Sequence, residues 1–270
     1  MSLAIGVVQK DFIIASSDSA LTMFSCDEEK YEKTGEIVMK EEPIRSEVKS
    51  EKVLKLTNKV LLTNCGNLVL TELIISELKY FVKDDYDLKK CSAIAKKVIS
   101  NIQQGVFLNK DNLFNSLTEN YKITSFQLWE MKSDFKTYID DLLSGAERGN
   151  NLIRGYSMYL LGFNEDGTTG LMDVRIGSYT SGPTDIKKGY PVILEGPDSR
   201  EYLQFLNLPI EERTFEGFAN RMSLVHARIS KDNQVNVSSD CSYNVLMRNG
   251  DFIDYSKFSI DTLELQKAFN

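Results

Sequence analysis

The sequence is poor in the residues that build metal clusters and disulfide frameworks. Histidine occurs once in 270 residues, and the four cysteines, which form no Cys-x-x-Cys pair, are Cys26, Cys65, Cys91 and Cys241. A single histidine, His226, excludes a histidine-rich metal site. Cysteines so far apart predict neither a zinc cluster nor a disulfide framework. We therefore expect no metal and no organic cofactor.

The chain also lacks an excess of basic charge and a long apolar run. It has 32 Lys and Arg against 39 Asp and Glu, whereas nucleic-acid binders usually carry a basic excess. Its longest apolar stretches, such as residues 60–62, are far shorter than a membrane span, and no basic segment precedes a signal-like apolar core. We expect no nucleic-acid partner, no membrane partner and a cytoplasmic location.

What the chain does have is apolar sequence with the spacing of strands and helices. A hydrophobic share of 42% over 270 residues is enough for a large core, in one sizeable domain or two small ones. The first half predicts four strands, which we expect to form one antiparallel sheet, at residues 3–8, 12–15, 52–56 and 60–64. The charged stretch between the two strand pairs, residues 26–49, predicts an exposed excursion with a hairpin around residues 36–40.

Helical spacing follows the first strands. Apolar residues recur every three or four positions after residues 68 and 94, which predicts two long amphipathic helices. Residues 107–150 predict further helix, and the apolar residues on one side of it, which indicate helix packing, are Phe126, Trp129, Phe135, Tyr138 and Leu142.

The second half returns to strands. They are predicted at residues 157–163, 170–176, 190–194, 243–248 and 252–255, with helices at 201–206 and 215–229. The order of strands, helices, strands, helix and strands predicts an α+β fold. We expect a four-layer αββα sandwich, in which two antiparallel sheets lie between helix layers.

Three stretches resemble proteasome β-type subunits and their bacterial relatives: SLAIGVVQKDFIIASSDSALT, EKVLKLTNKVLLTNCGN and YLLGFNEDGTTGLMDVRIGS. That family of N-terminal-nucleophile hydrolases has an αββα fold and places Thr, Ser or Cys at the mature N-terminus. An Asp follows sixteen residues later, a Lys opens the third strand, and a Gly follows that lysine by fourteen residues. Ser2 and Asp18 match the first spacing, and Lys52 and Gly66 match the second.

The resemblance implies that Ser2, Asp18, Lys52 and Gly66 form a catalytic site. A serine hydroxyl must pass its proton to a base, and a free α-amine, with a pKa of about 7.7–8.0, serves that purpose. Lys52 would supply a positive charge held by Asp18, and the N–H groups of Gly66 and Asn67 at a helix start would form an oxyanion hole. The site needs Met1 to be removed, because otherwise Ser2 carries an amide.

Two supporting loops of the family are altered or unassigned here. The family's Gly-Ser-Gly loop corresponds to Gly196-Pro197-Asp198-Ser199, in which Pro197 lacks a donor. A second loop, with Asp and Ser three apart in the family, should lie between residues 231 and 242. The candidates there are Asp232, Ser238, Ser239, Asp240 and Ser242.

Each candidate residue also has a structural interpretation. Ser2 is a common small residue after Met, Asp18 can belong to a turn cluster, Lys52 to a strand edge, and Gly66 to a helix N-cap. Cys65 is a core thiol or, as a remote alternative, a nucleophile paired with His226. That histidine is more typical of a satisfied, half-buried side chain than of a catalyst.

Two functions therefore stay open. The first is a serine- or threonine-type peptidase or amidohydrolase, acting on a peptide or amide substrate in a homo-oligomeric ring. The second is a catalytically inactive proteasome-like structural or assembly protein. The resemblance covers about two thirds of the chain and implies a single domain over residues 1–270, with insertions at about 26–49 and 107–150.

Overall fold

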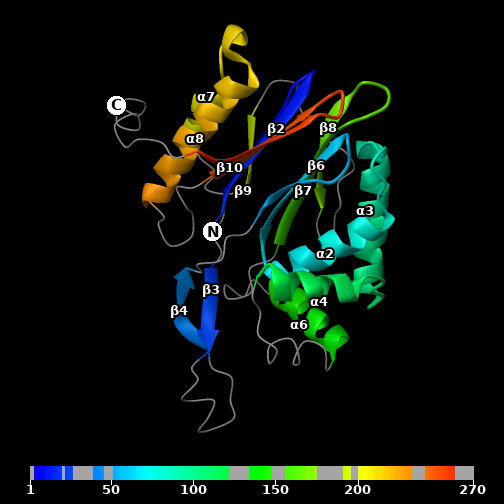
Figure 1. Ribbon diagram of the computed structural model, residues 1–270. Helices are drawn as coiled ribbons and strands as arrows, with labels where there is room; N and C mark the ends of the chain where they lie inside the picture. The colour runs from blue at the N-terminus through cyan, green and yellow to red at the C-terminus, as the bar shows by residue number, and fades with distance from the viewer. Residues whose placement is uncertain are drawn as a thin grey trace.

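The fold is built on two large antiparallel sheets (Figure 1). A computed structural model describes residues 3–19, 22–26, 39–45, 51–121, 134–147, 156–174, 191–195, 200–232 and 241–258. The five-stranded sheet has the order β11-β10-β2-β1-β9, with bounds β1 Ala4–Val8, β2 Phe12–Asp18, β9 Pro191–Glu195, β10 Cys241–Met247 and β11 Phe252–Phe258. The four-stranded sheet has the order β5-β6-β7-β8, with bounds β5 Val53–Lys55, β6 Val60–Gly66, β7 Tyr156–Phe163 and β8 Thr169–Val174.

The prediction that the first four strands form one sheet is wrong. The two hairpins form as expected, but β2 pairs with β10 and β1 with β9, whereas β6 pairs with β7. The hairpins face each other across an apolar layer that contains Val8 and Ile13 from one sheet and Leu61 and Leu161 from the other. Both faces of each hairpin are apolar, so stacking the sheets buries more apolar surface than pairing their edges does.

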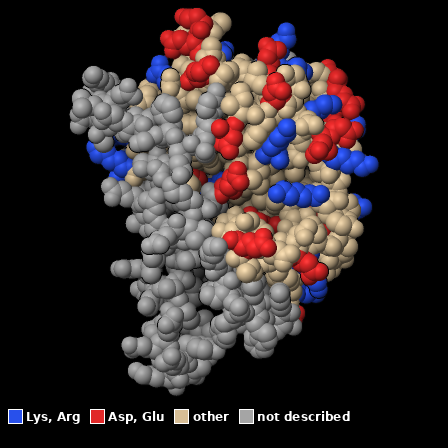
Figure 2. Space-filling model, in the orientation of Figure 1, with Lys and Arg blue, Asp and Glu red and all other residues tan. Residues whose placement is uncertain are grey.

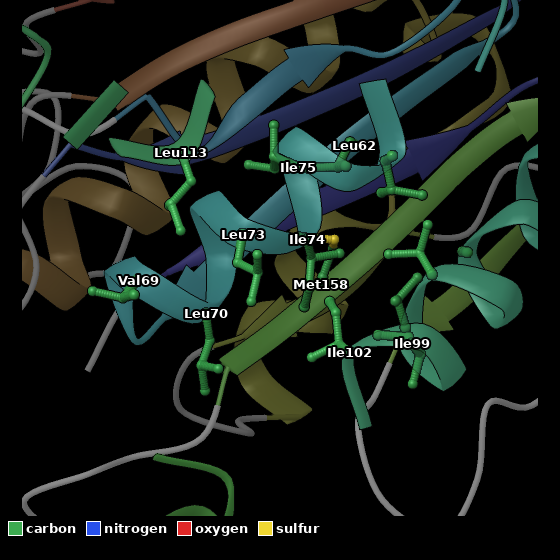
Figure 3. Packing of buried hydrophobic residues seen from close by; sticks show 14 of the residues in the cluster. Leu62, Val69, Leu70, Leu73, Ile74, Ile75, Ile99, Ile102, Leu113 and Met158 are labelled. Carbon is green, nitrogen blue, oxygen red and sulfur yellow. The ribbon is translucent and has the colours of Figure 1, made fainter. Parts of the chain in front are cut away.

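Helices cover the outer face of each sheet (Figure 1). The four-stranded sheet packs against α2 Leu68–Phe81 and α3 Leu88–Gln103. On α2 packs α4 Lys110–Glu119, and α6 Phe135–Glu147 contacts α4 through Phe114 and Phe135, so that all four helices share one apolar cluster. Figure 3 shows this layer, in which Leu70, Ile74 and Ile102 meet Met158 of β7. The five-stranded sheet packs against α7 Arg200–Leu206 and α8 Phe215–Asp232. The described residues therefore form helices, sheet, sheet and helices in turn, which is an α+β sandwich.

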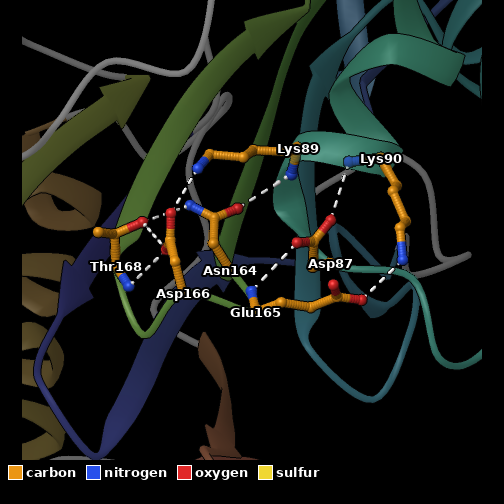
Figure 4. A network of polar contacts seen from close by, with 7 residues as sticks. All are labelled: Asp87, Lys89, Lys90, Asn164, Glu165, Asp166 and Thr168. Atoms are coloured by element: carbon orange, nitrogen blue, oxygen red, sulfur yellow. Dashed lines mark hydrogen bonds and ion pairs between the residues drawn. The ribbon is translucent and has the colours of Figure 1, made fainter.

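The helices predicted after the first strands and at 201–206 and 215–229 are present, while the described part of the predicted 107–150 helix forms two helices, α4 and α6. Several elements have local reasons for their bounds. Asn67 caps α2 and Asp87 caps α3, because each side chain accepts a hydrogen bond from the third N–H along the helix. Gly250 closes the last hairpin at a φ of 95°, a conformation that glycine adopts without steric cost. Between α3 and the β7–β8 turn, a polar network joins the two elements (Figure 4).

Two predictions in the insertions are met only in part. A two-stranded sheet of β3 Thr22–Cys26 and β4 Met39–Arg45 lies below the large sheets in Figure 1. Cys26 pairs with Met39, so residues 39 and 40 of the predicted 36–40 hairpin belong to a strand, while residues 36–38 lie outside the described residues. Of the predicted apolar stripe, Phe135 and Leu142 are buried and Tyr138 packs against them, while Phe126 and Trp129 lie outside the described residues.

None of the described helices has the length and apolar character needed to cross a membrane. On the face shown in Figure 2, acidic and basic side chains are interspersed over the described part.

Candidate functional site

A buried ion pair joins the two sheets at the end of β2. The Nζ atom of Lys52 lies 3.0 Å from each carboxylate oxygen of Asp18. Asp18 is fully buried and Lys52 is 4% exposed. Lys52 immediately precedes β5 in the other sheet, so the pair bridges the layers. Asp18 is the last residue of a strand and not part of a turn, which rules out the turn-cluster interpretation.

The ion pair lies next to the first described residue of the chain. The N–H of Leu3 donates to the Asp18 carboxylate at 2.8 Å, and the N–H of Asp18 donates to the Leu3 carbonyl at 3.0 Å. Asp18 therefore accepts hydrogen bonds from a backbone donor and an ammonium at once. Ser2 lies outside the described residues, so its predicted place in the site stays a prediction.

Gly66 and Asn67 lie at the junction of β6 and α2, as predicted. Gly66 is the exposed last residue of β6 and has a φ of 103°. The N-cap of α2 is Asn67, whose side chain accepts the N–H of Leu70, so the N-cap interpretation of Gly66 is wrong. The N–H of Asn64 donates to the carbonyl of Lys52 at 2.8 Å. Gly66 therefore lies two positions along β6 from Asn64, the residue whose N–H contacts the Lys52 carbonyl.

One of the five candidates for the second supporting loop lies beside the ion pair. Ser242 is in β10 opposite Ser17, and the two hydroxyl oxygens are 3.5 Å apart. Ser17 directly precedes Asp18 in β2. Asp232 is the last residue of α8, and the other candidates, Ser238, Ser239 and Asp240, lie outside the described residues, as does the loop 196–199.

A second buried polar pair, Ser16 and His226, was not predicted. The Ser16 Oγ lies 3.0 Å from the His226 Nε2, and both residues are fully buried. The expectation of a half-buried histidine is therefore wrong. Burial lowers the pKa of His226 to about 4, and the charge of Lys52 also lowers it while that of Asp18 raises it. The ring is neutral near neutral pH, and its Nδ1 has no hydrogen-bond partner among the described residues.

The remote alternative of a Cys65–His226 dyad is not formed. The side chain of Cys65 packs between the two sheets, with Leu61 and Leu161. His226 belongs to α8, which covers the opposite face of the five-stranded sheet. A layer of backbone therefore separates the two side chains. The signal for the Ser16–His226 pair was present in the sequence, since Ser16 and Ser17 interrupt an otherwise apolar strand.

The arrangement offers a fixed ammonium, a carboxylate and a strand-to-helix junction at one end of the sandwich. Among the residues that the structure describes, no three His, Cys, Asp or Glu side chains gather where they would hold a metal ion. The chemistry that these groups suit is stabilisation of negative charge on a neighbouring oxygen, because a buried ammonium acts strongly at short range.

Comparison with known proteins supports the fold. No protein-family model and no curated protein matches the sequence. Among solved structures, the chain is similar to the Anbu (Gly-1) mutant from Hyphomicrobium sp. strain MC1, with a TM-score of 0.55 and 9% sequence identity, over 100% of this chain and 93% of that one. Anbu is a bacterial proteasome-like protein. The likeness shows a proteasome-like fold, and at this identity it says nothing of catalysis.

Proposed function

We propose that the chain is an N-terminal-nucleophile hydrolase that cleaves peptide or amide bonds through an acyl-enzyme on Ser2. The observation that carries this proposal is the buried Asp18–Lys52 pair, whose carboxylate also binds the N–H of Leu3. One peptide bond joins Leu3 to Ser2. A buried charge pair costs free energy to desolvate, and a proteasome-like fold has no structural need of one at this position.

In the proposed mechanism, Ser2 uses its own α-amine as the base. The hydroxyl proton passes to the amine as Oγ attacks the substrate carbonyl carbon, and the N–H groups of Gly66 and Asn67 stabilise the oxyanion. The amine then gives the proton to the leaving nitrogen, which releases the first product. Water hydrolyses the ester and restores the hydroxyl. Lys52 favours the neutral amine and the developing alkoxide, and Asp18 holds Lys52 in place.

The remaining features of the proposal follow from the resemblance. We propose one domain over residues 1–270 with insertions at about 26–49 and 107–150, a homo-oligomer in the cytoplasm, and no cofactor. The alternative is a catalytically inactive structural or assembly protein with the same fold. Pro197 favours that alternative, because it removes a donor where the family uses a serine-containing loop.

The proposal is tested in two steps on protein made without a tag. Intact-mass measurement reports whether Met1 is removed, and labelling with a β-lactone reports whether Ser2 is nucleophilic. We expect the free serine at the N-terminus and one adduct, which Ser2→Ala abolishes, Lys52→Met strongly slows and Cys65→Ala leaves unchanged. Complete retention of Met1, or a label that survives Ser2→Ala, supports the inactive alternative and overturns the proposal.

A further inference from the structure

The Ser16–His226 pair is a polar contact inside an apolar layer. The layer between the five-stranded sheet and its two helices is built from aliphatic and aromatic side chains, among them Ile5, Ile14 and Val225. Burying a hydroxyl and an imidazole there costs free energy even when they bond each other, and two apolar residues of similar size would cost less. We therefore expect the Ser16–His226 pair to have a role other than packing.

The position of Ser16 links this pair to the ion pair. Ser16 and Asp18 are two residues apart in β2, so both lie on the same side of the strand. On β10 their partners are Tyr243 and Cys241, whose hydroxyl and thiol are 3.0 Å apart. His226 therefore contacts β2 at Ser16, two residues before Asp18, whose carboxylate binds Lys52.

The charges that face His226 come from β2 and from the residue before β5. Asp18 favours a protonated ring and Lys52 disfavours it. On β10, Tyr243 stays protonated, because burial and the Cys241 thiol raise its pKa. Burial of His226 outweighs the attraction of Asp18, and the ring stays neutral. A neutral ring binds the Ser16 hydroxyl without competing with Lys52 for the carboxylate.

We propose that His226 is a positioning residue, which fixes the end of β2 through Ser16 and thereby holds the Asp18 carboxylate in register with Lys52. Its effect on the ion pair stands independently of any activity. Its effect on catalysis rests on the proposed function, because it acts on Ser2 only through Asp18 and Lys52.

Three variants of the full chain separate positioning from packing. Ser16→Ala removes the hydroxyl with little change of volume, and His226→Gln keeps an amide at the place of Nε2. Val225→Ala, on the same helix and fully buried, is the matched packing control. The readouts are proton exchange of the Lys52 ammonium by NMR, the rate of β-lactone labelling, and the melting temperature.

For Ser16→Ala we expect faster ammonium exchange and labelling that is about tenfold slower or more, since a small displacement of a catalytic group has effects of this size. His226→Gln should keep the ammonium exchange rate and the labelling rate close to those of the wild type. Val225→Ala should lower the melting temperature without changing either of these two rates. The inference is overturned if Ser16→Ala leaves the ammonium exchange as it is in the wild type, or if Val225→Ala changes it equally. Should the wild type not be labelled at all, the proposed function fails, and ammonium exchange still decides the role of His226.

Discussion

Lys52 and Asp18 meet with both carboxylate oxygens 3.0 Å from one ammonium, across the boundary between the two sheets. Asp18 ends β2 and Lys52 immediately precedes β5, which belongs to the other sheet, yet each side chain is almost completely removed from water. If one partner of the pair is lost, water cannot solvate the charge that remains. The fold is therefore sensitive to loss of either partner of this pair.

Removing one partner of this pair should strongly destabilise the protein. We expect Asp18→Asn and Lys52→Met each to lower the free energy of unfolding by about 3–5 kcal/mol, because each leaves an uncompensated buried group. The double variant should lose much less than the sum of the two. Urea unfolding of the two single variants and the double variant measures this coupling. Lys89→Met, which breaks an exposed ion pair with Asp166, is the control and should leave the unfolding midpoint unchanged. Additive losses would contradict the prediction.

His226 should make the protein less stable as the pH falls below neutrality. Its pKa is about 4 in the folded protein against 6.5 for an exposed histidine. Between these values the unfolded chain binds a proton that the folded chain excludes, so the free energy of unfolding falls as the pH falls. A difference of about 2.5 in pKa, at about 1.36 kcal/mol for each, amounts to roughly 3 kcal/mol between pH 7 and pH 4.

Urea unfolding at a series of pH values tests this effect. Carboxylates also lose stability in acid, so the comparison that matters is the wild type against His226→Gln, which cannot take up the proton. The Gln variant should show a shallower fall between pH 6.5 and pH 4. Val225→Ala should shift the whole curve without changing its slope, and parallel curves for the wild type and the Gln variant would refute the prediction.

Gly66 should resist replacement by residues with a side chain. Its φ of 103° lies in a region that L-residues rarely adopt. We expect Gly66→Ala to lower the free energy of unfolding by about 1–2 kcal/mol. Gly66→Asn should cost less, since asparagine tolerates positive φ better. Thermal melting of both variants measures the difference, and an alanine variant as stable as the wild type would show that this strand end relaxes freely.

Asp87 should contribute to stability through two backbone contacts rather than through its charge. One carboxylate oxygen accepts the N–H of Lys90 at 3.0 Å and the other accepts the N–H of Glu165 at 3.1 Å, which joins α3 to the β7–β8 turn (Figure 4). Burial raises the pKa of Asp87, but these two hydrogen bonds and the charges of Lys90 and Lys59 together lower it by more, so the pKa lies below its ordinary value.

Loss of both contacts in Asp87→Ala should therefore cost about 2 kcal/mol, because α3 loses its cap and the part-buried N–H of Glu165 loses its partner. Asp87→Asn retains one oxygen acceptor and should lose less. Lys90→Ala removes the exposed ion pair with Glu165 and a cation–π contact with Tyr86, but neither contact of Asp87 with the backbone, and should change the urea midpoint little. A Lys90→Ala variant as unstable as Asp87→Ala would point instead to charge pairing as the main contribution.

Local sequence signals predicted most of the elements of the fold and their α+β sandwich, and failed on which strands share a sheet. The hairpin around Gly250, the helices after residue 68 and the strand-to-helix junction at Gly66 follow from turn chemistry and spacing within a few residues. The two N-terminal hairpins are both apolar on both faces, and neither pattern indicates whether the hairpins pair at their edges or stack face to face. That choice depended on β7, β9 and β10, which lie at least 90 residues along the chain from the strands that they pair with.

The candidate site divides in the same way. The spacings between Ser2 and Asp18 and between Lys52 and Gly66 are properties of the sequence alone, and the resemblance they carry implied that Asp18 holds Lys52. Only the tertiary structure decided that this ion pair is buried and that His226 contacts Ser16. Burial and charge pairing are set by which layers meet, because the free energy of a charged or polar group depends on its surroundings and not on its position in the chain.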